Sequence, residues 1–297
     1  MQLDRKFPTL LDRYYGWIVI AAIALLYAPL IAHWYDGWLN KNISLEHEYF
    51  SHGLIGLPFA AYIAWTDTRS RWRRLSEVTH PLAVPFLITG GIFYLSGLPD
   101  FTNLSFPLVL IGVCLWFKGI PGLKLEKFPL LLVILATPNE IPYLISPYTL
   151  PLQSFIASCA GFILTHFDVP VTVEQIYLYV NDKIVEVAPH CSGLKMLLTS
   201  LYVALMLLYW TGTLTSRGKT LTFLGSTVIL SVTANIIRNT LLTFFHGTGR
   251  EQIFAWLHEG WGGDLYSACM LGLLIPLLGS IEWIADYFHP GTDLEEG

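Results

Sequence analysis

The sequence predicts an all-α polytopic membrane protein with about eight transmembrane helices. Of its 297 residues, 54% are hydrophobic and only 13% are charged, whereas roughly a quarter of the residues in soluble domains are charged. The apolar residues also fall in long runs, close to the roughly 20 residues that a helix needs to cross a bilayer. The net charge of −5 and the lack of basic blocks argue against a nucleic-acid partner.

The apolar runs predict the helices in order along a single integral membrane domain, residues 1–297. The first run lacks a small-residue cleavage site and is followed by aromatic and acidic residues. We therefore expect a retained helix and not a signal peptide. The predicted spans are 16–34, 52–66, 82–98, 104–118, 128–145, 192–210, 219–245 and 265–287.

Basic residues give the predicted orientation, because cytoplasmic loops carry an excess of lysine and arginine. With these spans, twelve basic residues fall on one side, which we assign to the cytoplasm. Both termini are then cytoplasmic, and segments 35–51, 146–191 and 246–264 lie outside. The twelve are Arg5, Lys6, Arg13, Arg69, Arg71, Arg73, Arg74, Lys118, Lys124, Lys127, Arg217 and Lys219.

One apolar stretch, 150–167, does not fit this orientation as a span. Counting it would place residues 168–190 inside and invert every later segment, against Arg217 and Lys219. We therefore expect a re-entrant or interfacial segment on the outer side.

The polar segment 168–190 predicts a small extracytoplasmic hairpin. Valine, isoleucine and tyrosine alternate with polar residues on both sides of Asn181-Asp182, which is typical of two short strands joined by a turn. The second strand leads through Pro189 into the apolar helix that carries Cys191.

Cys191 has the surroundings of a nucleophile. Of the four cysteines, at 114, 159, 191 and 269, only Cys191 lies at a polar boundary, and no spacing suggests a metal site or a cofactor. A helix N-terminus and Lys195 both favour its thiolate. The alternative is that Cys191, Ser192 and Gly193 are small residues that let a helix start under close packing.

Arg238 is the second candidate, because a guanidinium within a span costs a few kcal/mol unless it faces protein or water. Ser231, Asn235 and Arg238 share one helical face. Arg238 follows Thr220 by about 27 Å of helix, which places it toward the outer end of its span. The alternative is an arginine that snorkels to the outer headgroups.

His258, in the last outer segment, is the third candidate. Histidine titrates near neutrality, and cysteine and histidine recur together as nucleophile and proton carrier. His246 competes for this role, since it ends the helix that carries Arg238. Either histidine can also be an ordinary interfacial residue.

Four short motifs together resemble the exosortase/archaeosortase family: Ser-His-Gly-Leu at 51–54, Cys-Ser-Gly-Leu at 191–194, Asn-Ile-Ile-Arg at 235–238, and His258 in Leu-His-Glu-Gly. Exosortases are eight-span membrane proteins of the bacterial inner membrane, regarded as cysteine transpeptidases. Their substrates carry a C-terminal signal of a Pro-Glu-Pro motif, a hydrophobic helix and a basic tail (PEP-CTERM). Many members have an acidic residue where this chain has Pro189. This difference and the sequence His-Glu-Gly at 258–260 are similar to the cyanobacterial branch.

The resemblance implies an active site on the extracytoplasmic side. Cys191 would attack the substrate carbonyl, Arg238 would stabilise the oxyanion or thiolate, and His258 would protonate the leaving amine. The thioester would pass to an acceptor, for which a lipid and a polysaccharide are both compatible. His52 and Lys195 would support substrate or thiolate, and Asn235 would orient Arg238.

Two alternatives use the same residues differently. A cysteine protease of the membrane would hydrolyse the thioester with water instead of transferring it. A non-catalytic transporter or assembly protein would use Cys191, Arg238 and His258 only for packing and snorkelling.

Overall fold

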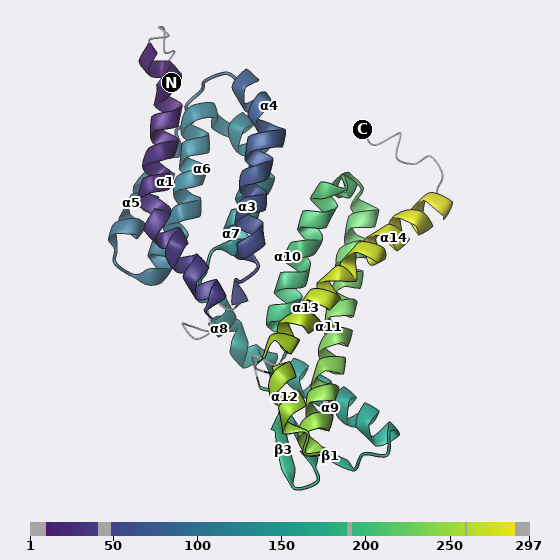
Figure 1. Cartoon of the computed structure of the whole chain (residues 1–297). Coiled ribbons are helices and arrows are strands. Elements are labelled where there is room, and N and C mark those ends of the chain that lie inside the picture. The colour runs from purple at the N-terminus through teal and green to yellow at the C-terminus, as the bar shows by residue number, and fades with distance from the viewer. Residues whose placement is uncertain (1–9, 41–48, 189–191, 259, 289–297) are drawn as a thin grey trace. The chain divides into compact units, whose positions relative to one another are not determined.

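The computed structural model describes residues 10–40, 49–188, 192–258 and 260–288 (Figure 1). The chain, which the sequence predicts to be one domain, groups into two compact units, Met1–Pro142 and Tyr143–Gly297. Among the described residues, strands occur only in the second unit.

The first unit is an assembly of apolar helices. They are α1 (Leu10–Leu39), α3 (Gly53–Ile63), α4 (Arg69–Arg74), α5 (Ala83–Leu95), α6 (Pro99–Leu125) and α7 (Lys127–Ala136), with a π-helical stretch, Ala64–Thr68, between α3 and α4 and the short α8 (Ile141–Ile145) after α7. Buried hydrogen bonds join α1 to α6: Trp34 Nε1 donates to Asn103 Oδ1 at 2.7 Å, and the hydroxyls of Tyr27 and Ser105 lie 3.0 Å apart.

The second unit combines a small sheet with long helices. Its elements are a 3-10 turn (Ser146–Thr149), α9 (Leu150–His166), β1 (Val171–Glu174), β2 (Tyr177–Val180), β3 (Lys183–Glu186), α10 (Leu194–Trp210), a second 3-10 turn (Thr213–Thr215), α11 (Arg217–Gly247), α12 (Glu251–His258), α13 (Trp261–Gly272) and α14 (Leu274–Phe288). One core joins α10, α11 and α14 through Ala204, Leu208, Phe223, Leu274 and Leu278.

The sheet is an antiparallel meander in the order β1-β2-β3. The predicted hairpin with its turn at Asn181-Asp182 is present as β2 and β3. The stretch 171–180, expected as one strand, forms two, so the sheet has one strand more than predicted. The chain turns a first time at Gln175, which has a positive φ of 55°, and a second time at Asn181, with a φ of 47°. A residue with left-handed backbone closes a tight turn. The alternation across 171–180 therefore belongs to two strands and not one.

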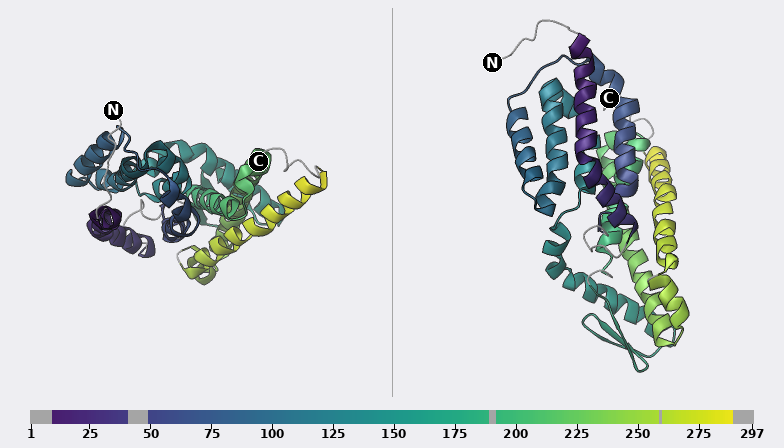
Figure 2. Two further views of the ribbon diagram at one scale, coloured as in Figure 1. Left: turned by 90° about the horizontal axis from the view of Figure 1, so that it is seen from above. Right: turned by 60° about the vertical axis from the view of Figure 1, so that its left-hand side comes forward.

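The inner face of the sheet packs on α9 and α11 at the end of α11, as Figure 1 and the right-hand view of Figure 2 show. Two glycines permit the close approach. A methyl group added to Gly161 of α9 would lie 2.3 Å from Val173 Cγ2, and one added to Gly247 of α11 would lie 2.4 Å from Val180 Cγ1. The sheet is therefore held against the helix that carries Arg238, and β3, the strand that precedes Cys191, also contacts this helix.

The all-α polytopic class is confirmed, but the count of eight spans is not. Among the described residues, five helices are long and apolar enough to cross a membrane: Gly16–Leu39, Pro99–Leu125, Pro147–His166, Arg217–Gly247 and Trp261–Phe288. Ala83–Leu95, Lys127–Ala136 and Leu194–Trp210 are shorter apolar helices.

Two predicted segments differ in detail. The predicted span 128–145 is not one helix, because α7 ends at Ala136 and Thr137 is extended before Pro138, a residue that disfavours helix in its predecessor. The stretch 150–167 is helical over Leu150–His166, and together with the preceding 3-10 turn, as Pro147–His166, it is long enough to span. Figure 1 shows it crossing the end of α11 beside the sheet, and its interfacial placement stays a prediction.

Candidate active site

The predicted nucleophile segment leads into α10. Cys191 lies outside the described residues, as do Pro189 and His190. Gly193 caps the helix with a φ of +81°, and its carbonyl accepts the first helical bond, from Leu197 N at 2.8 Å. Ser192 is 1% exposed, and its hydroxyl has no hydrogen-bond partner among the described residues. Lys195 is half-buried in the first turn.

Gly193 brings this helix start onto α11. A methyl group added to Gly193 would lie 2.6 Å from both Cγ and Nδ2 of Asn235, closer than real Cβ atoms approach a neighbour. The Asn235 side chain, 2% exposed, is thus packed directly against the residue two places after Cys191. This contact joins two of the sequence-predicted motifs.

Asn235 belongs to a polar row along the buried side of α11. Thr227, Ser231, Asn235, Asn239 and Thr243 recur at intervals of four residues, and each is less than 5% exposed. Residues four apart lie on one face of a helix. The Asn239 amide donates to the Asn235 carbonyl at 2.9 Å.

Arg238 reaches from α11 toward the start of α13. Its side chain is half-buried, and its Nε is buried without a hydrogen-bond partner among the described residues. Its Nη2 would lie 3.7 Å from a methyl group added to Gly263. Tyr266, one turn further along α13, donates its hydroxyl to the Ala234 carbonyl at 2.6 Å, which ties α13 to the turn before Arg238.

His258 ends α12 beside the same glycine. Its ring stacks on Phe254 with a centroid separation of 5.1 Å, and its carbonyl would lie 3.9 Å from a methyl group on Gly263. Arg238 Nη2 and the backbone of His258 therefore both border Gly263. A methyl group added to Gly262 would lie 2.5 Å from the Trp256 ring, so the start of α13 can pack this closely on α12 only because residue 262 is a glycine.

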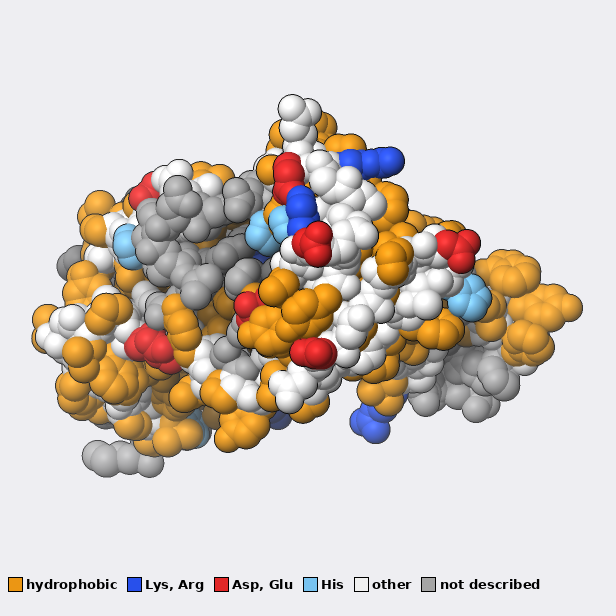
Figure 3. Space-filling model, turned by 90° about the horizontal axis from the view of Figure 1, so that it is seen from below, with side chains coloured by type: hydrophobic (Ala, Val, Ile, Leu, Met, Phe, Trp, Pro, Cys, Tyr) orange, Lys and Arg blue, Asp and Glu red, His pale blue; other side chains and the backbone are white. Residues whose placement is uncertain are grey.

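His246, the competing histidine, is engaged elsewhere. Its Nδ1 lies 3.1 Å from Glu251 Oε2, and Glu251 also binds Lys183 of β3. The Lys183 hydrogen bond holds the pKa of Glu251 below its ordinary value, with a smaller contribution from His246. Seen from below, acidic, basic and histidine side chains meet on this surface (Figure 3). The cluster ties β3 to α12.

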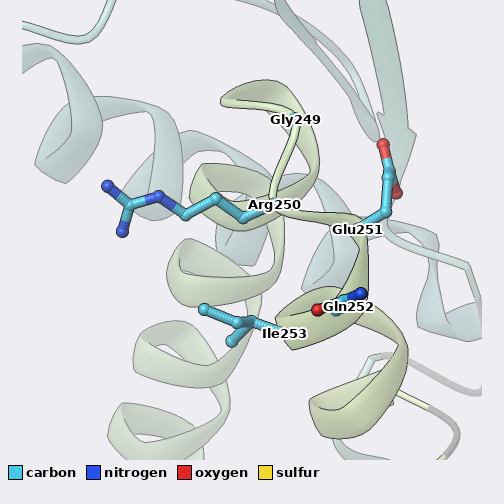
Figure 4. Close-up of a pocket in the computed structure, with 5 residues that line it drawn as sticks. All are labelled: Gly249, Arg250, Glu251, Gln252 and Ile253. Atoms are coloured by element: carbon cyan, nitrogen blue, oxygen red, sulfur yellow. The ribbon is translucent and has the colours of Figure 1, made fainter.

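A shallow pocket of about 380 Å³ lies next to this cluster, lined by Gly249, Arg250, Glu251, Gln252 and Ile253. Figure 4 shows Glu251 pointing toward the strands and Arg250 pointing away from them. The sequence-predicted site residues do not line it, so we base the candidate site on the contacts of α10, α11 and α13.

Two further residues in the second unit were not predicted from the sequence. Gln153 of α9 is 3% exposed and donates from Nε2 to the carbonyl of Val187 at 2.8 Å, four residues before Cys191. Tyr266 donates a hydrogen bond to the Ala234 carbonyl, in the helical turn of α11 that precedes Arg238. The one available signal for Gln153 was an amide within an apolar run, where a polar group needs a partner.

His52, the remaining predicted residue, belongs to the first unit. It is buried at the start of α3, and its Nε2 lies 3.0 Å from the carbonyl of Leu135 in α7. Within the first unit, therefore, His52 joins two helices.

Fold and site together define a class: a multi-pass helical membrane protein with a polar centre where α10, α11 and the α12–α13 turn meet. Comparison with protein-family models matches residues 38–275 to the family described as Transmembrane exosortase (Exosortase_EpsH). The chain belongs to the transmembrane exosortase family. Comparisons with curated proteins and with solved structures each returned no match.

Proposed function

We propose that this exosortase is a cysteine transpeptidase that acts on PEP-CTERM-type sorting signals, with Cys191, Arg238 and His258 as its catalytic residues. The observation that carries the proposal is the contact of Gly193 with Asn235, since it sets the segment that follows Cys191 against α11 one turn before Arg238. The shared approach of Arg238 and His258 to Gly263 adds support.

In the proposed reaction the Cys191 thiolate attacks the carbonyl carbon of the scissile peptide bond. The carbonyl electrons move to oxygen, and the Arg238 guanidinium stabilises this oxyanion. When the oxyanion collapses, the C–N bond breaks and His258 donates a proton to the leaving amine. The thioester is then attacked by an acceptor nucleophile, which gives its proton back to His258, and the Cys191 thiolate is released.

The proposed role would justify the position of Arg238. A preorganised donor aimed at a developing oxyanion contributes roughly 3–4 kcal/mol to the transition state. Placing arginine in a span costs a similar amount, about 2.5–3.5 kcal/mol on insertion scales. The Nε without a described partner leaves donor capacity for a substrate oxygen.

The substrate in this proposal is a protein whose C-terminal hydrophobic helix enters the bilayer beside the enzyme. The site would lie at the extracytoplasmic surface of the bacterial inner membrane, with both termini in the cytoplasm, and the acceptor would be a lipid or a polysaccharide. Support for this orientation comes from the twelve basic residues on the opposite side.

The test is co-expression of the enzyme with a tagged substrate that ends in a Pro-Glu-Pro signal. We expect the wild-type enzyme to shorten the substrate and Cys191→Ala to leave it intact at equal membrane levels. Processing by Cys191→Ala would contradict the proposal and favour a non-catalytic role. The mass of the new substrate C-terminus separates transfer, which adds the acceptor, from hydrolysis, which adds water.

A further inference from the structure

The open edge of β3 lies directly before the nucleophile segment. Within the described residues, β3 pairs only with β2. The chain leaves β3 at Glu186, passes through the fully buried Val187 and reaches Cys191 five residues after the strand ends. The strand and the nucleophile are therefore parts of one short connection.

The register shows which backbone groups of β3 face outward. Val187 N donates to Ile176 O at 2.9 Å, which fixes the hydrogen-bonded pairs in this ladder. Because bonded and non-bonded pairs alternate along an antiparallel ladder, Val185 bonds to β2, whereas Ile184 and Glu186 turn their amide and carbonyl groups away from it. Within the described part of the chain, these outward groups have no hydrogen-bond partner.

The edge is also held in place and accessible. Val187 is fixed by Gln153, and Lys183 by its ion pair with Glu251. The Ile184 side chain is 58% exposed on the outer face of the sheet. A fixed edge with unpaired backbone groups is a template for another extended chain.

From this geometry we propose that the substrate binds as an added strand on the edge of β3. Its backbone forms hydrogen bonds with the outward main-chain groups of Ile184 and Glu186 before Cys191 attacks. This inference rests on the proposed function. An edge strand selects an extended backbone through main-chain hydrogen bonds, and the enzyme chain reaches Cys191 five residues after this edge ends. A Pro-Glu-Pro stretch can pair in this way, because two prolines at alternate positions turn their missing amides to the solvent side.

The test replaces single edge amides in the full-length enzyme in its membrane. Ile184→Pro and Glu186→Pro each remove one outward N–H and leave the ladder with β2 intact. The matched control is Val171→Pro, which removes an outward N–H from β1, the opposite edge of the same sheet.

We expect Ile184→Pro and Glu186→Pro each to lower substrate processing about tenfold at equal membrane levels, since each variant loses one main-chain hydrogen bond to the substrate together with strand alignment. Val171→Pro should stay near wild type. Normal processing by both β3 proline variants would overturn the inference. If both β3 proline variants process substrate normally, and wild type does so while Cys191→Ala does not, the strand-addition inference fails but the proposed cysteine chemistry is supported.

A second measurement does not depend on folding of the proline variants. In the Cys191→Ala background, a photoreactive phenylalanine analogue at position 184 should cross-link to the co-expressed substrate, and the same analogue at position 172, exposed on β1 at the opposite edge, should not. Cross-linking at 184 mainly to a second copy of the enzyme would show that the edge is an interface between copies and would contradict the inference.

Discussion

Gly193 lies against the Asn235 side chain so closely that the two fit only because residue 193 has no Cβ. The same glycine holds a φ of +81°, a backbone conformation that other residues rarely adopt. One residue thus sets both the direction in which the chain enters α10 and the distance between α10 and α11. Two residues earlier along the chain is Cys191.

Gly193→Ala is expected to lower substrate processing at least about tenfold, because it adds a clash with Asn235 to a strained backbone, together of order 1–3 kcal/mol. The matched control is Gly212→Ala. Gly212 also has a left-handed φ, of +76°, but nothing lies within 4 Å of its added methyl group. The measurement is the fraction of substrate cleaved at equal membrane levels. Equal losses in both variants would mean that backbone strain, and not the contact with Asn235, matters.

Gln153→Leu is expected to reduce processing while protein still accumulates in the membrane. The change removes the bond from Nε2 to the Val187 carbonyl and leaves that buried acceptor unsatisfied, at about 1–3 kcal/mol. Thr165→Val is the control in the same helix, since among the described residues the Thr165 hydroxyl bonds within α9, to the Gly161 carbonyl. If the two variants process substrate equally well, Gln153 does not position the nucleophile segment.

Cys191 should react with a membrane-impermeant thiol reagent added from the outside, and should do so below pH 8. The helix N-terminus at Gly193 and the nearby Lys195 favour its thiolate. Cys114, Cys159 and Cys269 lie within helices and should be protected by protein or lipid. Mass spectrometry of labelled wild type and Cys191→Ala identifies the reactive thiol. Labelling of Cys191 only after detergent is added would remove the physical basis of an activated, accessible nucleophile.

The Lys183–Glu251–His246 cluster should make stability depend on pH. Because the pKa of Glu251 is lowered in the folded protein, its stabilising contribution is complete above the ordinary value of 4.5 and is lost as pH falls through the lowered pKa. The melting temperature in detergent should therefore fall more steeply below pH 4.5 for wild type than for Glu251→Gln. The difference will be small, because Glu251 is exposed. Equal slopes for the two proteins would contradict the assigned role of Glu251.

The fold class could be predicted because apolar runs report directly on helices in a bilayer. The strand count was missed, although the apolar residues shift by one position, from odd numbers at Val171 and Val173 to even numbers at Leu178 and Val180, across the turn at Gln175. That turn depends on one left-handed residue without a glycine to mark it. Likewise, α7 ends at Ala136 although apolar residues resume at Ile141, after Pro138-Asn139-Glu140.

For the candidate site, motif spacing predicted Asn235 and Arg238 because they share one helical face. The contact between Gly193 and Asn235 joins residues 42 positions apart, a separation at which no periodicity operates. Gln153 was missed for the same reason, since its partner is a backbone carbonyl in another element. Contacts of this kind arise from tertiary packing alone.

The most direct test of the account is a set of substitutions at Arg238, measured as substrate cleavage at equal membrane levels. Arg238→Lys keeps the charge but loses the planar fork that could hold an oxyanion, so cleavage should fall at least about tenfold, and Arg238→Ala should abolish it. Arg250, exposed over Phe244, provides the control, and Arg250→Lys and Arg250→Ala should cleave normally. A snorkelling arginine tolerates lysine. Near-normal cleavage by Arg238→Lys or Arg238→Ala would remove Arg238 from the active site and contradict the proposed catalytic centre.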